Sequence, residues 1–307
     1  MSKEEKKEGM DAKLSRREFD VLEVLINSSE ALSQRQLERC TIYSLSTINR
    51  IVKELVDKNY IKDGMITAEG ISALEPYTVK RAIFIAAGFG TRLVPVTLNT
   101  PKPLVRVNGK RIIDGLIDAC LNIGINEIYI VRGYLSEQFD QLLYKYPMIK
   151  FLENPSYNEA NNISSALCAR DLMSNAYVFE ADLLLHNPLI LKKYHYTSNF
   201  LGIKVERTDD WCFSVRDGII QEQKIGGLNC YLEVGISYWD DVSGRKLAKH
   251  LKTAYEMPGG KEKFWDQVPL AIYPDEYHVE IRECNMTDNV EIDTFKELKA
   301  IDKSYDV

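Results

Sequence analysis

Residues 81–107, RAIFIAAGFGTRLVPVTLNTPKPLVRV, combine a glycine-rich turn with two cations. The apolar run AIFIAA predicts a buried strand that leads directly into Gly88 and Gly90. Glycines after such a strand allow backbone N–H groups to approach phosphate oxygens closely. Arg92 and Lys102 follow the turn, and fixed cations stabilise the charge that builds up when a nucleotide phosphate is attacked. The segment therefore predicts a site for a nucleoside triphosphate.

The glycine pattern separates this turn from two common nucleotide-binding loops. It is neither the G-x-G-x-x-G of a Rossmann fold nor a Walker A loop, which requires GK[ST]. Instead, AAGFGTRL followed by PKPL, with Lys102 ten residues after Arg92, resembles the paired motifs of nucleotidyltransferases with a doubly wound α/β fold. Arg92 is then expected on the β and γ phosphates, and Lys102 on the α-phosphoryl group and the acceptor phosphate. The loop residues expected to bind the nucleotide are Ala87, Gly88, Phe89, Gly90 and Thr91.

Two aspartates at the ends of apolar segments predict a magnesium site. Asp182 ends AYVFEAD, and Asp293 ends VEID. The carboxyl ends of parallel strands open on the ligand crevice, and Mg2+ takes carboxylates together with substrate phosphates and water. The resembled family holds its metal with an Asp-x-Asp-like element and a later Asp, and here Glu180 stands where that family often has Asp. We therefore expect Asp182 and Asp293 to bind Mg2+, with Glu180 and Glu291 beside them on the acceptor side.

A polar stretch, ENPSYNEANNISSAL (153–167), precedes a predicted helix. Asparagine and serine at a helix start usually serve as caps. We nevertheless expect base or ribose contacts from this stretch, with Asn154, Asn161 and Ser164 as the candidates.

The order of segments over residues 81–303 narrows the resemblance. AAGFGTRL, TPKPLVRVNGK, INEIYIVRGY, YVFEADLLL and VEIDTFKEL together are most similar to the bacterial CTP:phosphocholine cytidylyltransferases. The resemblance implies that a phosphocholine oxygen attacks the α-phosphorus of CTP in line, giving CDP-choline and pyrophosphate without a covalent enzyme intermediate. Phosphoethanolamine and 2-aminoethylphosphonate stay open as acceptors, and sugar 1-phosphates are less favoured.

Three tryptophans next to aspartates fit a cationic acceptor. They occur as Asp210-Trp211, Trp239-Asp240 and Trp265-Asp266. Aromatic faces beside carboxylates suit a quaternary ammonium, although a single tryptophan more often packs in a core. The residues expected to bind the acceptor are Glu180, Trp211, Trp239, Trp265, Asp266 and Glu291.

Apolar strands alternate with amphipathic helices from Arg81 onward. These elements are expected to position the candidate site residues. Strand-like segments at 82–87, 127–133, 149–154 and 176–182 are separated by helical segments near 111–122, 135–145 and 161–173. This order predicts a doubly wound α/β domain over residues 80–307, with a mixed, mostly parallel sheet. Further strands near 200–205, 211–216, 228–238 and 277–283 are expected to complete the sheet and close over the acceptor.

A smaller domain is predicted at residues 13–79, behind a charged, disordered tail at 1–12. Helical periodicity at 17–28, 33–40 and 45–57, followed by a hairpin around Asp63-Gly64, resembles a winged helix-turn-helix. Residues 1–79 hold 12 Lys and Arg against 14 Asp and Glu, a net charge of −2. Because DNA readers normally present a basic surface, DNA is a partner that we allow but do not favour.

Composition bounds the remaining possibilities. The chain has 307 residues and a net charge of −6, and its six cysteines form no CxxC pair, so we expect reduced thiols in the core. We find no signal peptide or membrane span and expect a cytoplasmic enzyme. A homodimer is left open. The competing class is a transcriptional regulator whose transferase-like domain senses a nucleotide, but the presence of both cations and both aspartates favours catalysis.

Overall fold

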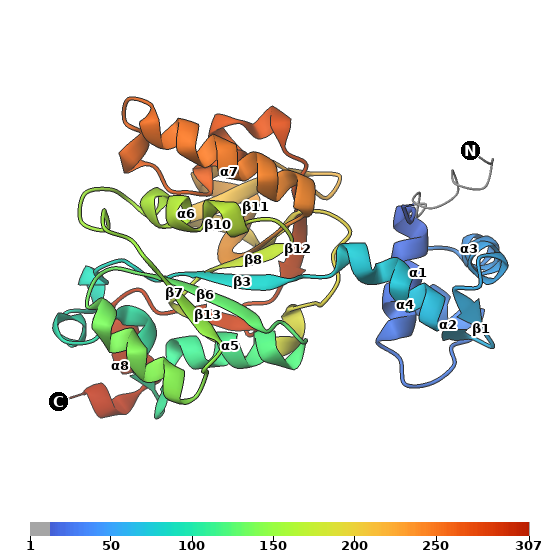
Figure 1. Ribbon diagram of the computed structural model, residues 1–307, viewed down its shortest axis with the longest axis horizontal. Coiled ribbons are helices and arrows are strands. Elements are labelled where there is room, and N and C mark those ends of the chain that lie inside the picture. Colours follow the sequence, from blue (N-terminus) through green and yellow to red (C-terminus); the bar gives the residue numbers. More distant parts are fainter. Residues whose placement is uncertain (1–12, 307) are drawn as a thin grey trace, which may run out of the picture. The chain divides into compact units, whose positions relative to one another are not determined.

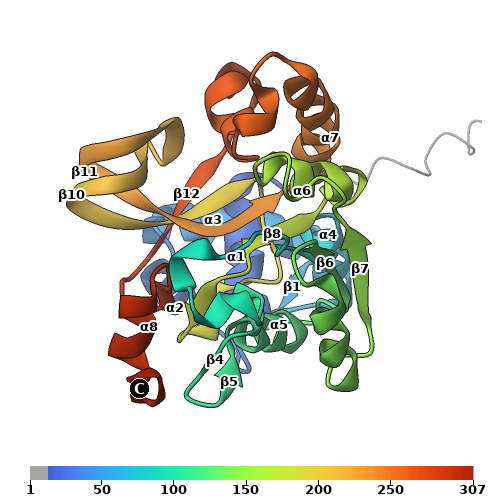
Figure 2. The ribbon, with the colours of Figure 1, turned by 90° about the vertical axis from the view of Figure 1, so that its left-hand side faces the viewer.

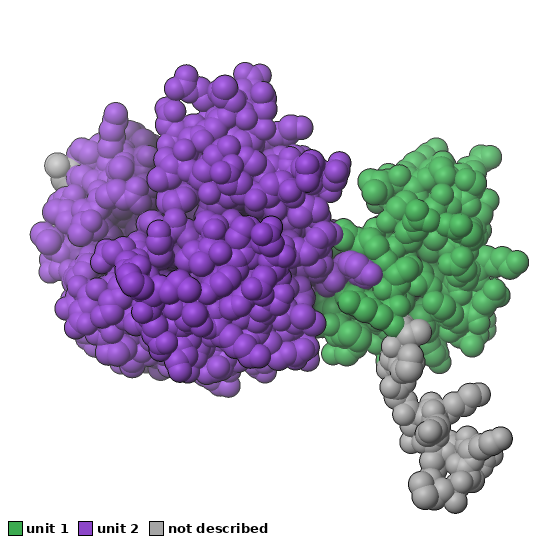
Figure 3. All heavy atoms as spheres, turned by 90° about the horizontal axis from the view of Figure 1, so that it is seen from above, with its two compact units in different colours: residues 1–78 green, residues 79–307 purple. Residues whose placement is uncertain are grey.

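The computed structural model describes residues 13–306, which form parts of two compact units, Met1–Thr78 and Val79–Val307. Figure 3 colours the two units separately. The boundary between the units, after Thr78, lies one residue before the predicted boundary between residues 79 and 80. The predicted disordered tail, residues 1–12, lies outside the described residues.

The first unit is a small helical domain with a two-stranded wing, as predicted. Ser15 and Ser33 each cap a helix through a capping box, in which the serine and the residue three positions later bond to each other's backbone N–H groups. The wing turns through Asp63 and Gly64, both with positive φ, and Ile61 pairs with Ile66. The elements are α1 Arg16–Ile26, α2 Gln34–Cys40, α3 Leu45–Asp57, β1 Ile61–Lys62, β2 Met65–Ile66, α4 Ala68–Leu74 and the 3-10 helix η1 Glu75–Tyr77.

The second unit is built on a seven-stranded sheet in the order β10-β12-β11-β8-β3-β6-β7 (Figure 1). Strand β3 runs parallel to both β6 and β8, β6 runs parallel to β7, and β11 runs antiparallel to β8. The predicted mixed, mostly parallel sheet is therefore confirmed. The strands are β3 Arg81–Ile85, β6 Glu127–Arg132, β7 Ile149–Glu153, β8 Ala176–Glu180, β10 Asn199–Arg216, β11 Ile219–Trp239 and β12 Glu280–Cys284.

Helices cover both faces of this sheet. In Figure 1, α6 and α7 lie on one side of the sheet and α5 lies on the other. Adjacent residues of β3 face opposite cores: Phe84 packs in the cluster that contains α5, whereas Ile83 packs in the cluster that contains α7. The helices are α5 Ile112–Asn122, α6 Ile163–Ala169, α7 Asp241–Glu256 and α8 Phe295–Ile301. No helix among the described residues has the length and apolar content that crossing a membrane requires.

Two features outside the regular layers shape the ligand crevice. Strands β10 and β11 form a long ribbon that extends away from the sheet in Figure 2 and turns at Asp217 and Gly218, both with positive φ. Short strands β9 Leu183–Leu185 and β13 Asn289–Glu291 pair antiparallel, and β4 Arg106–Val107 pairs with β5 Lys110–Arg111. The remaining short helices are η2 Thr91–Leu93, η3 Val96–Leu98, η4 Lys102–Leu104, η5 Ser136–Tyr144, η6 Arg170–Leu172, η7 Pro188–Ile190, η8 Gly260–Glu262, the π-helix η9 Val268–Ile272, η10 Pro274–Glu276 and η11 Lys303–Tyr305.

Candidate active site

The glycine-rich turn after β3 opens on a cavity of about 290 Å3. Gly90 has φ +62°, and a Cβ atom there would lie 3.0 Å from Cβ of Lys102 and 3.1 Å from Cγ2 of Thr97. Glycine is therefore needed both for the backbone conformation and for the close approach of Lys102. A Cβ atom at Gly88 would meet nothing within 4 Å. From the predicted loop and cations, the residues that line this cavity are Gly88, Gly90, Thr91, Arg92 and Lys102.

Ala87, which precedes the turn, and Phe89, which lies within it, do not line the cavity, contrary to expectation. Ala87 is buried, and its carbonyl oxygen accepts a hydrogen bond from the backbone N–H of Tyr134 at 3.1 Å. The ring of Phe89 packs against the rings of Tyr134 and Tyr157, with centroids 5.1 and 5.4 Å apart. The Ala87 carbonyl and the Phe89 ring therefore attach the loop to Tyr134 and Tyr157.

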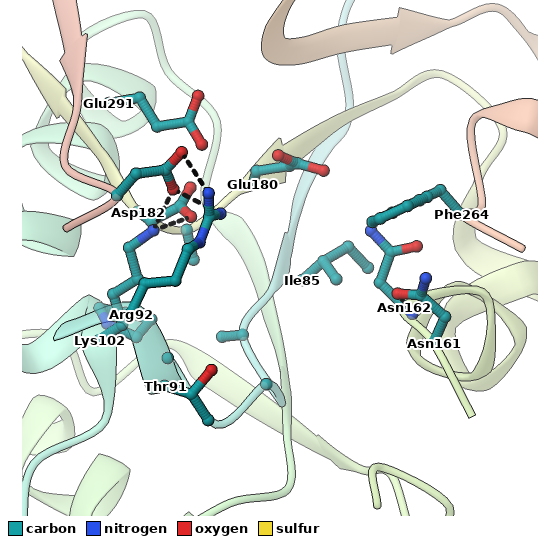
Figure 4. A pocket seen from close by; sticks show the side chains of 16 residues that line it. Ile85, Thr91, Arg92, Lys102, Asn161, Asn162, Glu180, Asp182, Phe264 and Glu291 are labelled. Carbon is teal, nitrogen blue, oxygen red and sulfur yellow. Dashed lines mark hydrogen bonds and ion pairs between the residues drawn. The ribbon is translucent and has the colours of Figure 1, made fainter. Parts of the chain in front are cut away.

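The two predicted catalytic cations contact the two predicted metal ligands (Figure 4). Nζ of Lys102 lies 2.6 Å from Oδ2 of Asp182 and 3.0 Å from Oδ1 of Asp293. The Arg92 guanidinium donates to both oxygens of Asp293, at 2.8 and 2.7 Å. Burial alone would lower the pKa of Lys102, but the carboxylates of Asp182 and Asp293 outweigh it and raise that pKa above its ordinary value. Lys102 is therefore a charged ammonium held in a buried position.

Asp182 also belongs to a group of three neighbouring carboxylates. Glu180, Asp182 and Glu291 each place one oxygen within 4.8 Å of the others. The second oxygen of Asp182, Oδ1, is buried and finds no hydrogen-bond partner within residues 13–306. Burial, and then the charge of Asp182, raises the pKa of Glu180 well above its ordinary value and that of Glu291 to about 8. An unpartnered oxygen among mutually repelling carboxylates fits a hard divalent cation.

The pairing of β9 with β13 explains why residues more than a hundred positions apart meet here. Asp182 lies two residues beyond Glu180, the last residue of β8, and immediately before β9. Leu183 of β9 pairs with Glu291 of β13, so Asp293 also comes to the carboxyl edge of the sheet. The structure thus groups Asp182 with Glu180 and Glu291, whereas Asp293 contacts the two cations.

A second cavity, of about 570 Å3, adjoins the first. Both are lined by Arg92, Glu180, Glu291, Asp293 and Phe264. The second cavity has an aromatic wall, in which the rings of Trp211 and Phe264 meet edge to face with centroids 5.6 Å apart. Four further carboxylates line it, those of Asp210, Glu233, Asp266 and Glu297. The predicted acceptor residues Trp211, Asp266, Glu180 and Glu291 therefore share one cavity.

Trp239 and Trp265 do not reach this cavity, which corrects the expectation of an acceptor contact. Trp239 is 0% exposed and Trp265 is 2% exposed, and their rings meet edge to face at 5.9 Å inside the core that contains α7. The Trp239 indole donates to Oγ of Ser237 at 3.0 Å. Trp239 is the last residue of β11, followed by the N-cap Asp240 of α7, and Trp265 lies in the loop before η9. In both places the tryptophan ring packs into the core, so an aspartate next to it in sequence does not place both in one site.

Of the predicted nucleotide-binding residues in the polar stretch before α6, only some line a cavity. Asn154 is buried, and its Nδ2 donates to the hydroxyls of Ser164 and Ser165, both at 3.0 Å. Asn154 and Ser164 therefore stabilise the entry to α6 and do not line either cavity, contrary to expectation. Asn161 and its neighbour Asn162 do line the first cavity, and Figure 4 shows them across it from Arg92 and Lys102.

Glu233 is one of the carboxylates of the second cavity that were not predicted from the sequence. It lies in the strand segment CYLEVGISYW, where it is the one charged residue in an otherwise largely apolar run. A carboxylate in such a run is costly to bury and signals a partner, a metal or a ligand. That signal was available from the sequence.

Comparisons with known proteins agree with both units. Residues 81–198 match the family model for nucleotidyl transferase, and residues 12–64 match that for the MarR family. Over 228 residues the chain is 37% identical to the 2-aminoethylphosphonate cytidylyltransferase of Lancefieldella rimae, covering 73% of this chain and 92% of that protein. It is 31% identical to the choline-phosphate cytidylyltransferase of Streptococcus pneumoniae, covering 73% and 97%.

A solved structure supports the same assignment. The CTP:phosphocholine cytidylyltransferase LicC of Streptococcus pneumoniae superposes with a TM-score of 0.68 at 30% identity, covering 74% of this chain and 99% of that chain. The chain therefore belongs to the nucleotidyltransferase family as one of its cytidylyltransferases, and it carries a MarR-type winged helix domain ahead of the transferase domain.

Proposed function

We propose that this cytidylyltransferase transfers the CMP group of CTP to a small amine that carries a phosphate or phosphonate. An oxygen of the acceptor attacks the α-phosphorus in line, the bond to the departing pyrophosphate breaks, and no covalent enzyme intermediate forms. The observation that carries the proposal is that two cavities meet at one ionic network. The glycine-rich turn and both cations line the first cavity, and an aromatic wall with several carboxylates lines the second.

Ion pairs within the protein hold Arg92 and Lys102 at the positions where we propose that they bind phosphate. Without nucleotide, Arg92 and Lys102 are neutralised by Asp293 and Asp182. In the proposed complex, phosphate oxygens replace these carboxylates as partners of the two cations. Arg92 then neutralises the departing pyrophosphate, and Lys102 orients the α-phosphoryl group and the attacking oxygen.

We propose Mg2+ as the metal of this site. Asp182 would hold it with Glu180 and Glu291, and Asp293 would join as the cations turn to phosphate. Bound Mg2+ would neutralise charge on nonbridging phosphate oxygens. The unpartnered Oδ1 of Asp182, among the described residues, supports this choice, as does the all-oxygen donor set.

For the acceptor we propose 2-aminoethylphosphonate first. Of the three tryptophans, only Trp211 lines the second cavity, so the aromatic surface available to a quaternary ammonium is small. Carboxylates dominate instead, and a primary ammonium donates three hydrogen bonds that carboxylates accept. The relative from Lancefieldella rimae, which bears this activity in its name, supports the same acceptor.

Phosphocholine is the second candidate because the edge-to-face pair of Trp211 and Phe264 remains in the cavity. An aromatic face attracts a trimethylammonium group through its quadrupole. The similarity to the Streptococcus pneumoniae choline-phosphate cytidylyltransferase supports this alternative.

A pyrophosphate-release assay with the full-length protein tests the proposal. CTP, UTP, ATP and GTP would each be supplied with Mg2+ and with 2-aminoethylphosphonate, phosphocholine, phosphoethanolamine or a sugar 1-phosphate. We expect turnover with CTP and an amine acceptor, and its loss when EDTA removes the metal. Absence of turnover with every amine, or faster turnover with a sugar phosphate, would rule the proposal out.

A further inference from the structure

Gln223 joins two carboxylates of the second cavity. Its Nε2 lies 2.8 Å from Oε2 of Glu233 and 2.6 Å from Oδ2 of Asp266. The side chain is 7% exposed, and its own carbonyl oxygen, Oε1, is buried without a hydrogen-bond partner among the described residues. The amide thus uses its donor atom on both carboxylates and leaves an acceptor atom next to them.

The folded ribbon brings these groups together. Phe213 of β10 pairs with Gln223 on one side and with Tyr231 on the other, so two segments of β11 lie alongside the same residue. Asp266 comes from the segment before η9, where the neighbouring Trp265 is fixed in the core. The backbone N–H of Gln267 donates to Oδ1 of Asp266 at 3.1 Å and holds that carboxylate in place.

The protein supplies no positive charge to this carboxylate pair. Among the described residues that line the second cavity, Arg92 is the only cation, and its guanidinium is bonded to Asp293. Gln223 is neutral, so it positions the two carboxylates without cancelling their charge. Burial, followed by the charge of Asp266, raises the pKa of Glu233 well above its ordinary value. Such a pair is stabilised when a ligand brings a cation to it.

We propose that Glu233 and Asp266, held by the positioning residue Gln223, form a subsite for a primary ammonium group of the acceptor. This inference rests on the proposed function. A primary ammonium donates hydrogen bonds to both carboxylates and to Oε1 of Gln223. A trimethylammonium has no N–H group and would desolvate these oxygens without replacing their hydrogen bonds, so the subsite selects against it.

The test is acceptor discrimination by the full-length protein. With CTP and Mg2+, kcat/KM would be measured for phosphoethanolamine and phosphocholine, and for 2-aminoethylphosphonate and its N-trimethyl derivative. The members of each pair differ in N-methylation alone. We expect the wild type to prefer the primary amine of each pair.

Two variants and one control separate positioning from general damage. We expect Glu233→Gln and Gln223→Met to raise KM for the primary amine by about tenfold to a hundredfold. The KM for CTP and the kcat should change much less, and the preference over the methylated partner should shrink. Glu222→Gln is the matched control because Glu222 lies on the same strand but is exposed, 3.1 Å from Lys224. It should leave the preference unchanged.

The outcomes distinguish this inference from the proposed function. Turnover of amines with the methylated partner preferred by the wild type, or an unchanged preference in active Glu233→Gln, would overturn the subsite alone. Turnover with no amine acceptor would overturn both. If the variants do not fold, calorimetric binding of the two members of each pair to the wild type decides, since equal affinities would contradict the subsite.

Discussion

Lys102 is the residue on which the proposed chemistry of the site depends. It is 7% exposed and lies within hydrogen-bond distance of two carboxylates from distant parts of the chain. The sequence alone predicts a cleft residue whose loss leaves the fold intact. The structure shows a buried ammonium, so its removal also leaves Asp182 and Asp293 without their compensating charge.

Replacement of Lys102 by alanine therefore has two expected effects. Loss of transition-state stabilisation should lower kcat by about a hundredfold or more. The unpaired carboxylates should also lower the free energy of unfolding, measured by urea denaturation followed by circular dichroism. Lys110→Ala, which removes an exposed lysine of β5, is the control. A near-wild-type kcat for Lys102→Ala would contradict the assigned role.

Glu291 makes the stability of the ligand-free protein depend on pH. Burial, and then the charges of Asp182 and Asp293, raises its pKa from 4.5 to about 8. The folded state therefore binds more protons than the unfolded state between these values, so the free energy of unfolding decreases as the pH rises through this range. We expect Tm to fall from about pH 5 to about pH 8.

Glu291→Gln tests that pH effect, because it removes the titrating group. The decrease in Tm should become smaller, although Glu180 and Glu233 shift in the same direction and keep part of it. Glu222→Gln serves again as an exposed control. Parallel Tm profiles for wild type and Glu291→Gln would show that another group causes the pH dependence.

At the scale of elements, the β10–β11 ribbon forms much of the acceptor cavity. Its residues Trp211 and Glu233 line that cavity, and Gly235 makes room for Glu180 of the neighbouring strand β8. A Cβ atom at Gly235 would lie 2.7 Å from Cβ and 2.8 Å from Cγ of Glu180. The strand pairing of Ile236 with Phe179 leaves little freedom to relieve this contact.

Gly235→Ala should displace the Glu180 carboxylate from both cavities. We expect lower kcat/KM for the acceptor and a loss of about 1–3 kcal/mol in the free energy of unfolding, as in other overpacked cores. Gly115→Ala in α5 is the control, since its Cβ would lie 3.7 Å from the nearest atom, an ordinary contact. Wild-type kcat/KM for Gly235→Ala would contradict the expectation that the position of Glu180 matters for the acceptor.

Local patterns predicted the elements better than they predicted the contacts among them. The glycine-rich turn and both aspartates were predictable because each lies close to the end of an apolar strand. Both cations were predictable because they belong to the linked motifs AAGFGTRL and PKPL. Trp239 and Trp265 were not, since their placement depends on which sheet face meets α7. The helix predicted near 135–145 is a 3-10 helix, Ser136–Tyr144, and the strands predicted at 200–205 and 211–216 are one bent strand, β10. Hydrophobic periodicity does not distinguish these cases.

At the scale of the whole molecule, each unit has a core of its own. Phe19, Leu22, Ile48 and Leu55 are buried within the first unit, and the second unit contains its separate layers on both sides of the sheet. The exposed side of α3 carries Arg50 and Lys53 together with Glu54 and Asp57. The balanced charge leaves DNA binding by this MarR-type unit a disfavoured hypothesis.

Deletion of residues 1–78 should leave a folded, active transferase. The expected circular dichroism spectrum retains the α/β signal, and kcat should stay within about twofold of the full-length value, because all residues of the two cavities lie beyond residue 78. Insoluble protein, or a large loss of kcat in soluble protein, would show that the first unit is required for the transferase and is more than an appendage.

The ribbon from Asn199 to Trp239 gathers several residues of the proposed acceptor site in one continuous segment of the chain. One continuous stretch of gene encodes Trp211, Gln223 and Glu233, while a different stretch encodes the turn and the cations that handle phosphate. Under the proposed function, we expect mutations that change the acceptor to accumulate in the first stretch while selection preserves the second. Under the proposed function, exchange of this hairpin among relatives should therefore yield enzymes that link CMP to a different amine.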